Sequence, residues 1–167
     1  MNKKHHVATL AVTIAVCGAL FTISGSAQAA VQGALPTKLA LKAAEAALAA
    51  CEAGGYSVTV AIVDREGVTR LMVADDGAGP VGILTSRRKA FTAAALGIST
   101  GAIAAHVKAS GEPFPPLDPE ILILPGGLPI RSHGVVIAGV GVGGADKSEK
   151  DEACAQAGID AIAGELN

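Results

Sequence analysis

Aromatic side chains are almost absent from this chain of 167 residues, which has no tryptophan, one tyrosine and three phenylalanines. Alanine, valine, isoleucine and leucine must therefore fill the core in place of large rings. Such small side chains favour close packing of helices and strands. They also suit a homo-oligomer in which several copies share apolar surface.

Positive charge is scarce as well, with 13 basic residues against 15 acidic ones and a formal net charge of −2. Two of the lysines precede residue 30, where no acidic residue occurs, so the remainder of the chain is more acidic still. Nucleic-acid binding generally requires a basic footprint. The charge balance therefore argues against a nucleic-acid partner.

Histidine is rare, and only His106 and His133 follow residue 29. The chain has no G-x-S-x-G, H-E-x-x-H or C-x-x-C pattern, so we predict no catalytic residue and no zinc site. His106 falls near the end of a predicted helix and is interpreted as a surface residue. His133 lies in a predicted turn, either as a solvated side chain or as a contact for a ligand or metal.

The first 29 residues have the pattern of a secretory signal peptide. Lys3 and Lys4 give a basic start, Val7 to Ile23 is an apolar run, and Ala27-Gln28-Ala29 is a small-residue cleavage site. The run is shorter than the ~20 apolar residues of a transmembrane helix, although an uncleaved anchor is the alternative. We therefore predict export and a single domain over residues 30–167.

Two cysteines follow the predicted cleavage site, Cys51 and Cys154. Export would permit a disulfide between them. Both, however, lie in alanine-rich helical patterns, where an isolated cysteine usually behaves as a small core residue. The favoured interpretation is two core thiols, with a disulfide as the alternative.

Helical and strand patterns alternate along the rest of the chain. Apolar periodicity and turn residues predict helices at Thr37–Ala53, Thr85 or Ser86 to Leu96, Gly101–Ala109 and Ser148–Ala163, with Thr37 and Ser148 as caps. Strands are predicted at Ser57–Val63, Val68–Ala74, Ile121–Leu124, Ile130–Ser132 and Val135–Val142. Hairpins indicate an antiparallel sheet with helices on its faces, which is the α+β class.

Gly139 to Gly144 match the dinucleotide-binding pattern G-x-G-x-x-G. That site needs a second parallel strand after the next helix, and the chain after Gly144 has room for one helix only. The glycines at 139, 141 and 143 instead alternate, so they share one face of a strand. A face without side chains lets a helix, a ligand or another backbone approach closely.

Arg87-Arg88-Lys89 is predicted to lie in the first turns of the second helix. Cations there oppose the helix dipole and invite an anion, such as a carboxylate, a propionate or an acidic patch on a partner. Thr92 follows Arg88 by one turn, so the two share a face that could hold an acidic, otherwise apolar ligand. Salt bridges from the basic residues to Asp75 and Asp76 are the alternative.

Several segments together carry a family likeness: TVAIVDREG at Thr59–Gly67, DGAGP at Asp76–Pro80, RKAFTA at Arg88–Ala93, GGLP at Gly126–Pro129 and GVGV at Gly139–Val142. In this order they closely resemble the HbpS/GlcG family of exported haem-binding proteins. The resemblance implies a profilin-like α+β domain with a five-stranded antiparallel sheet, assembled into large homo-oligomers. It also implies haem binding and, in part of the family, haem degradation, iron binding and redox sensing with a membrane sensor kinase.

The resemblance also suggests a haem site, because the threonine of the RKAFTA segment has been tied to haem binding in the family. Here Thr92 would lie against the macrocycle, and Arg88 and Lys89 would meet the propionates. The complete set of candidate cofactor-binding residues is Thr92, Arg88, Lys89, Phe91, Gly126, Gly127 and His133. Two alternatives stay open: an enzyme or accessory subunit that binds a small carboxylate near Gly126-Gly127 and Arg88, and an interaction module that docks a partner through its basic helix start.

Overall fold

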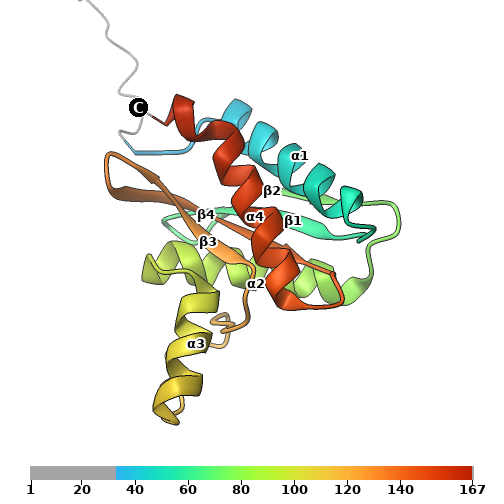
Figure 1. The fold of residues 1–167 in the computed structure, drawn as a ribbon. Coiled ribbons are helices and arrows are strands. Elements are labelled where there is room, and N and C mark those ends of the chain that lie inside the picture. Colours follow the sequence, from blue (N-terminus) through green and yellow to red (C-terminus); the bar gives the residue numbers. More distant parts are fainter. Residues whose placement is uncertain (1–32, 167) are drawn as a thin grey trace, which may run out of the picture.

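The computed structural model describes residues 33–166, so the predicted signal peptide lies outside the described residues. Figure 1 shows the elements in chain order. They are α1 (Thr37–Ala53), β1 (Thr59–Asp64), β2 (Thr69–Ala74), α2 (Pro80–Leu96), α3 (Thr100–Ser110), β3 (Gly127–Ser132), β4 (Val135–Gly143), α4 (Ser148–Ile162) and a short 3-10 helix, η1 (Ala163–Glu165).

The strands form one antiparallel sheet in the order β2-β1-β4-β3. Helices α1 and α4 lie side by side on one face of this sheet, and α2 covers the other face (Figure 1). Helix α3 projects away from the sheet on the side of its edge strand β3 (Figure 1). The predicted α+β class is thereby confirmed.

The sheet has four strands within the described residues, so the expectation of five strands is wrong. The missing strand is Ile121–Leu124, which forms irregular backbone. Its polar groups find partners elsewhere: the Leu122 N–H donates to the Thr92 hydroxyl at 2.8 Å, and the Ile121 N–H closes a turn onto Asp118. These two bonds take N–H groups that a neighbouring strand would otherwise need.

Helix α2 begins five residues before the earlier of its two predicted starts. Pro80 occupies its first turn, where the absent N–H of proline costs nothing, and Gly79 precedes it as the N-cap. Arg87, Arg88 and Lys89 therefore lie in the middle of the helix. The argument that they attract an anion by opposing the dipole at a helix start is wrong.

The predicted side-chain caps of two other helices are also absent. Pro36 and Lys147 hold the N-cap positions of α1 and α4, and neither helix has a side-chain cap hydrogen bond. Ser99, in contrast, caps α3, because its hydroxyl accepts the Ala102 N–H at 3.2 Å.

The alternating glycines of β4 face α2. A Cβ at Gly141 would overlap the Ser86 carbonyl and lie 2.5 Å from the Ala90 amide nitrogen, and one at Gly139 would lie 2.8 Å from the Ala94 nitrogen. The backbone of α2 thus lies directly on the backbone of β4, which confirms that the bare face receives a helix. Because β4 pairs antiparallel with both neighbours, no dinucleotide-binding strand–helix–strand unit exists here.

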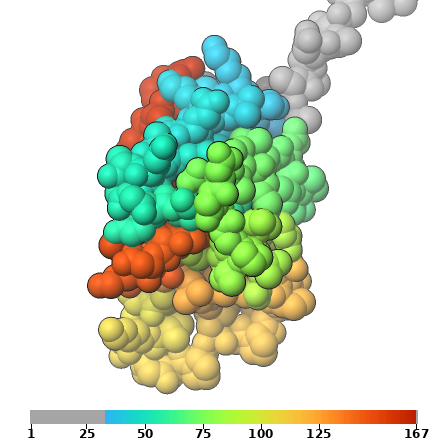
Figure 2. Space-filling view, turned by 90° about the vertical axis from the view of Figure 1, so that its right-hand side faces the viewer, coloured from blue at the N-terminus to red at the C-terminus, as the bar shows by residue number. Residues whose placement is uncertain are grey.

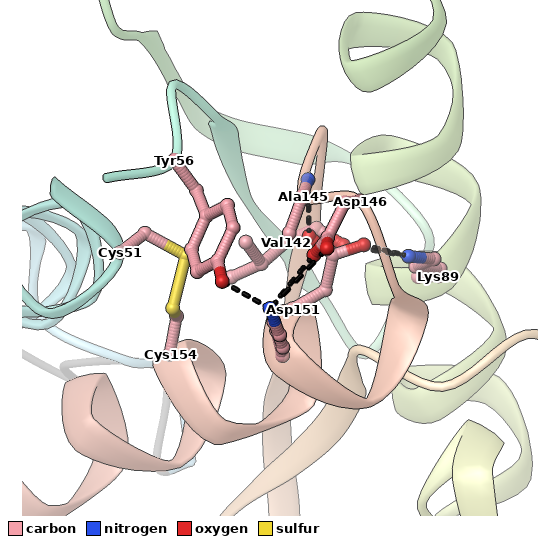
Figure 3. The surroundings of a disulfide bond; sticks show 9 residues. Cys51, Tyr56, Lys89, Val142, Ala145, Asp146, Asp151 and Cys154 are labelled. Atoms are coloured by element: carbon pink, nitrogen blue, oxygen red, sulfur yellow. Dashed lines mark hydrogen bonds and ion pairs between the residues drawn. A yellow bond between two sulfur atoms is a disulfide. The ribbon is translucent and has the colours of Figure 1, made fainter. Parts of the chain in front are cut away.

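Cys51 and Cys154 form a disulfide that joins α1 to α4, so the favoured interpretation of two free core thiols is wrong (Figure 3). The two helices pack closely enough for the bond because small residues line their contact. A Cβ at Gly158 of α4 would lie 2.6 Å from the Ala43 carbonyl oxygen of α1. The resulting Cα–Cα distance of 5.5 Å between the cysteines is typical of a disulfide.

We expect reduction of this disulfide to lower the free energy of unfolding by about 2–4 kcal/mol, because it closes a long loop in the unfolded chain. The two cysteines are separated by 103 residues. Urea unfolding of the protein with and without dithiothreitol measures the effect. A Cys51→Ser, Cys154→Ser variant is the control and should not respond to the reductant. Equal midpoints for the oxidised and reduced protein would contradict the prediction.

Within residues 33–166, no single helix is long and apolar enough to cross a membrane. Helices α2 and α3 together pass the same test of length and composition, but they bend by 81° at their junction. Gly97 ends α2 there with a left-handed backbone conformation.

Candidate functional site

The RKAFTA segment holds residues 111–126, which we call the proline-rich loop, against α2. The Arg88 guanidinium donates to the carbonyl oxygens of Pro119 and Ile121, at 2.5 and 3.2 Å. Thr92 is fully buried, and its hydroxyl donates to the Arg88 carbonyl while accepting the Leu122 N–H, each at 2.8 Å. Arg88 and Thr92 are thus brought together, and both fix the loop.

Arg87 adds an ion pair with Glu120 of the same loop. The alternative of salt bridges to Asp75 and Asp76 is therefore wrong for Arg87. The expectation assumed that the basic residues lie near the start of α2, whereas the structure places them next to the proline-rich loop.

Lys89 forms a buried ion pair with Asp151 of α4. Its ammonium donates to Asp151 Oδ2 at 2.7 Å and to the Val142 carbonyl oxygen at 2.9 Å (Figure 3). The side chains are only 2% and 3% exposed, and Asp151 Oδ1 also accepts the Ala145 N–H. Burial raises the pKa of Asp151 above its ordinary value, and the hydrogen bond and charge of Lys89 oppose that shift.

Gly126 and Gly127 make room for Lys89. A Cβ at Gly126 would lie 2.9 Å from the Lys89 ammonium, and one at Gly127 would lie 2.8 Å from the Lys89 carbonyl carbon. The Gly127 N–H and carbonyl both bond the hydroxyl of Thr100, at 2.9 and 3.3 Å. These two glycines therefore join α2, α3 and the start of β3 at one point.

Phe91 and His133 lie apart from this group. Phe91 packs beneath the β1–β2 hairpin, where a Cβ at Gly67 would lie 2.9 Å from its ring. His133 is exposed in the turn between β3 and β4, with a φ of 48°. The structure thus gathers five of the seven predicted residues where α2 meets the proline-rich loop and β3, whereas Phe91 lies on another face of α2 and His133 in the β3–β4 turn.

A hollow runs along β3 between α3 and α4, and we call it the β3 groove. It consists of two adjoining parts of about 680 and 550 Å³ that share Leu128 and Gln156 in their walls. Lys108 and Pro125 line the first part. Arg131 and His133 line the second. His133 is thereby the one predicted site residue that contributes to this groove.

Glu152 holds the two sides of the β3 groove together. Its carboxylate accepts hydrogen bonds from the Ser99 hydroxyl at 2.8 Å, the Gly101 N–H at 3.1 Å and the Gly126 N–H at 2.9 Å. One side chain of α4 thus anchors the start of α3 and the end of the proline-rich loop. Sequence reasoning missed Glu152 and Asp151, because acids at a helix start are ordinarily explained by the helix dipole.

Among residues 33–166, no group of three histidine, cysteine, aspartate or glutamate side chains could hold a metal ion. An iron-containing group in this part of the chain would therefore bring most of its own ligands and take at most two side chains from such a set. A tetrapyrrole meets that requirement, because the macrocycle supplies four nitrogens.

Residues 35–160 match the family described as haem-degrading HbpS-like proteins. The chain belongs to this family. A double mutant of HbpS from Streptomyces reticuli is 35% identical, with a TM-score of 0.71, and the match covers 92% of this chain and 99% of that chain. No curated protein is significantly similar in sequence.

Two further solved structures of this HbpS-like fold are similar. The protein ORFY from Klebsiella pneumoniae is 29% identical with a TM-score of 0.70, over 77% of this chain and 90% of that chain. PduOC, crystallised as a haem complex, is 26% identical with a TM-score of 0.71, over 77% of this chain and 95% of that chain.

Proposed function

We propose that this HbpS-like protein is an exported, oligomeric haem-binding protein and that haem occupies the β3 groove. The observation that carries the proposal is the groove itself, whose two parts measure about 680 and 550 Å³, with a histidine in its wall. The haem complex of the related PduOC supports the choice of ligand.

The groove offers the chemistry that haem requires. Leu128, Pro129 and Ile159 provide apolar surface for the macrocycle. Lys108 and Arg131 provide cations for the propionates. Because few aromatic rings are present in the chain, aliphatic contacts must hold the macrocycle in place of stacking.

His133 is the candidate iron ligand, because imidazole is a common axial ligand of haem iron. It is exposed, and it lies in a short turn held by Arg131, whose guanidinium donates to the Gly134 carbonyl at 2.9 Å. The same guanidinium donates to the Gly97 carbonyl at 2.6 Å, which ties the turn to the end of α2.

Thr92 acts in this proposal as a positioning residue. Its hydroxyl is buried and bonded, so it reaches haem only through the proline-rich loop that it holds at Leu122. That loop ends at Pro125, which lines the groove, and at Gly126, which Glu152 anchors. A change at Thr92 would therefore move a wall of the groove.

Two observations support export and assembly. A disulfide is typical of oxidising compartments and agrees with the predicted signal peptide. Ile83 and Leu84, near the start of α2, are 41% and 67% exposed. Large apolar side chains gathered on a surface are typical of protein–protein contacts, as in a homo-oligomer.

Haemin titration of the purified mature protein, followed at the Soret band, tests the function. The wild-type protein should bind haemin saturably, and His133→Ala should weaken binding at least about tenfold, as losses around metal ligands commonly do. His106→Ala, which changes an exposed histidine outside the groove walls, is the matched control and should bind like wild type. Absence of saturable binding would refute the function, and an unaffected His133→Ala variant would refute the groove.

The role of Thr92 predicts different results for two substitutions. Thr92→Val removes the acceptor of the Leu122 N–H and should destabilise the local structure by about 1–3 kcal/mol, whereas Thr92→Ser keeps that acceptor. Amide hydrogen exchange over residues 119–126 should therefore rise in the valine variant alone, and haemin affinity should fall with it. Equal exchange in both variants would contradict a positioning role.

A further inference from the structure

A second cavity, separate from the β3 groove, lies where the starts of α2 and α4 meet the end of the proline-rich loop. Its volume is about 260 Å³, and it shares no lining residue with the groove. Lys89 and Asp151 line it from within, and Val81 and Leu124 line it where it opens to solvent. Figure 2 shows the three segments meeting on one face of the molecule.

The Lys89 ammonium has a hydrogen-bond donor to spare in this cavity. It carries three N–H groups, and within the described residues its acceptors are Asp151 Oδ2 and the Val142 carbonyl oxygen. The side chain is 2% exposed. These two acceptors leave one N–H of Lys89 that can still donate to a ligand in the cavity.

The surroundings of Lys89 favour an anionic partner. Because Asp151 balances the charge of Lys89, the positive potential that attracts an anion comes from the starts of the two helices in the walls. Gly79 and Lys147 are the N-caps of α2 and α4, and neither helix has a side-chain cap hydrogen bond. Ser148 also lines the cavity and can offer a hydroxyl.

We propose that this cavity binds a small carboxylate with a short apolar tail. The carboxylate accepts the third N–H of Lys89 and is stabilised by the start of α4, and the tail lies between Val81 and Leu124. At about 260 Å³ the cavity has less than half the volume of either part of the β3 groove, which suits an acid of a few carbons. The site is independent of the haem proposal, because the two cavities share no wall.

Calorimetric titration of the purified mature protein with three matched probes tests the proposal. Butyrate, 1-butanol and butylamine have the same tail but carry a negative, no and a positive charge. Butyrate should bind saturably, and the other two should bind about 10–100-fold more weakly. This difference in affinity corresponds to the loss of one or two charge-assisted hydrogen bonds. Equal binding of the three probes, or no binding of butyrate, would overturn the proposal.

Variants connect the binding to Lys89. Because Lys89→Met alone would leave Asp151 buried without its partner, the test uses Lys89→Met, Asp151→Leu, which removes both charges. Butyrate affinity should fall at least about tenfold in this variant. Lys108→Met, the same change in the β3 groove, is the matched control and should leave butyrate affinity unchanged.

Ser148→Ala provides a milder variant that keeps the ion pair intact. It should weaken butyrate binding several-fold, and it keeps the test decisive if the double variant does not fold. Unchanged butyrate affinity in Ser148→Ala, or a folded double variant that binds butyrate normally, would overturn the assignment. Haemin titration of Ser148→Ala should match wild type, which distinguishes this cavity from the haem site.

Discussion

Replacement of Gly141 by valine is expected to destabilise the fold by more than about 3 kcal/mol, beyond the usual cost of an overfilled core. The added Cβ would overlap the Ser86 carbonyl and lie 2.5 Å from the Ala90 nitrogen. Both obstacles are helix backbone, which cannot rotate away as a side chain can. Helix α2 would have to lift from β4 and would take the proline-rich loop with it.

Urea unfolding of Gly141→Val, compared with Gly79→Ala, measures this effect. A Cβ at Gly79 would meet nothing within 4 Å, and its φ of −82° suits any residue. Gly79→Ala should therefore stay within about 1 kcal/mol of wild type, the range of an N-cap substitution. A Gly141→Val protein as stable as this control would show that α2 does not rest on the β4 backbone.

The second large effect is expected at the buried ion pair. Lys89→Met should lower the free energy of unfolding by about 3–5 kcal/mol, because it leaves the Asp151 carboxylate buried without its cation. The double variant Lys89→Met, Asp151→Leu should recover most of that loss, since replacing both charges by apolar side chains is often nearly neutral.

A double-mutant cycle of Lys89→Met and Asp151→Leu in denaturant measures the coupling between the two side chains. Strong coupling, with the double variant more stable than Lys89→Met, is the expected result. Additive losses would mean that the two charges do not stabilise one another in the folded protein.

Local patterns in the sequence predicted much of the fold. The β1–β2 hairpin follows from strand-forming residues on either side of Asp64–Gly67. The glycines at every second position of β4 predicted a close approach by a helix, a ligand or another backbone, and helix α2 makes it. The start of α2 was predicted too late, although Gly79-Pro80 is a typical helix start. Ile121–Leu124 has the composition of a strand, but Thr92 takes the Leu122 N–H that a strand would need.

The contacts that build the candidate sites could not be predicted in the same way. Lys89 and Asp151 are 62 residues apart, Ser99 and Glu152 are 53 apart, and the two bridged cysteines are 103 apart. Each pairing depends on how α4 packs against the rest of the molecule, which periodicity does not report. The family resemblance supplied the fold and pointed to Thr92, but only the packing shows that Thr92 is buried beneath a loop.

The central claim is that haem occupies the β3 groove, and a crystal structure of the protein with haemin tests it most directly. The account predicts density for the macrocycle along β3 between α3 and α4, with the iron bound to His133 and the propionates near Lys108 or Arg131. Haem bound on any other surface, with His133 free in its turn, would contradict the account.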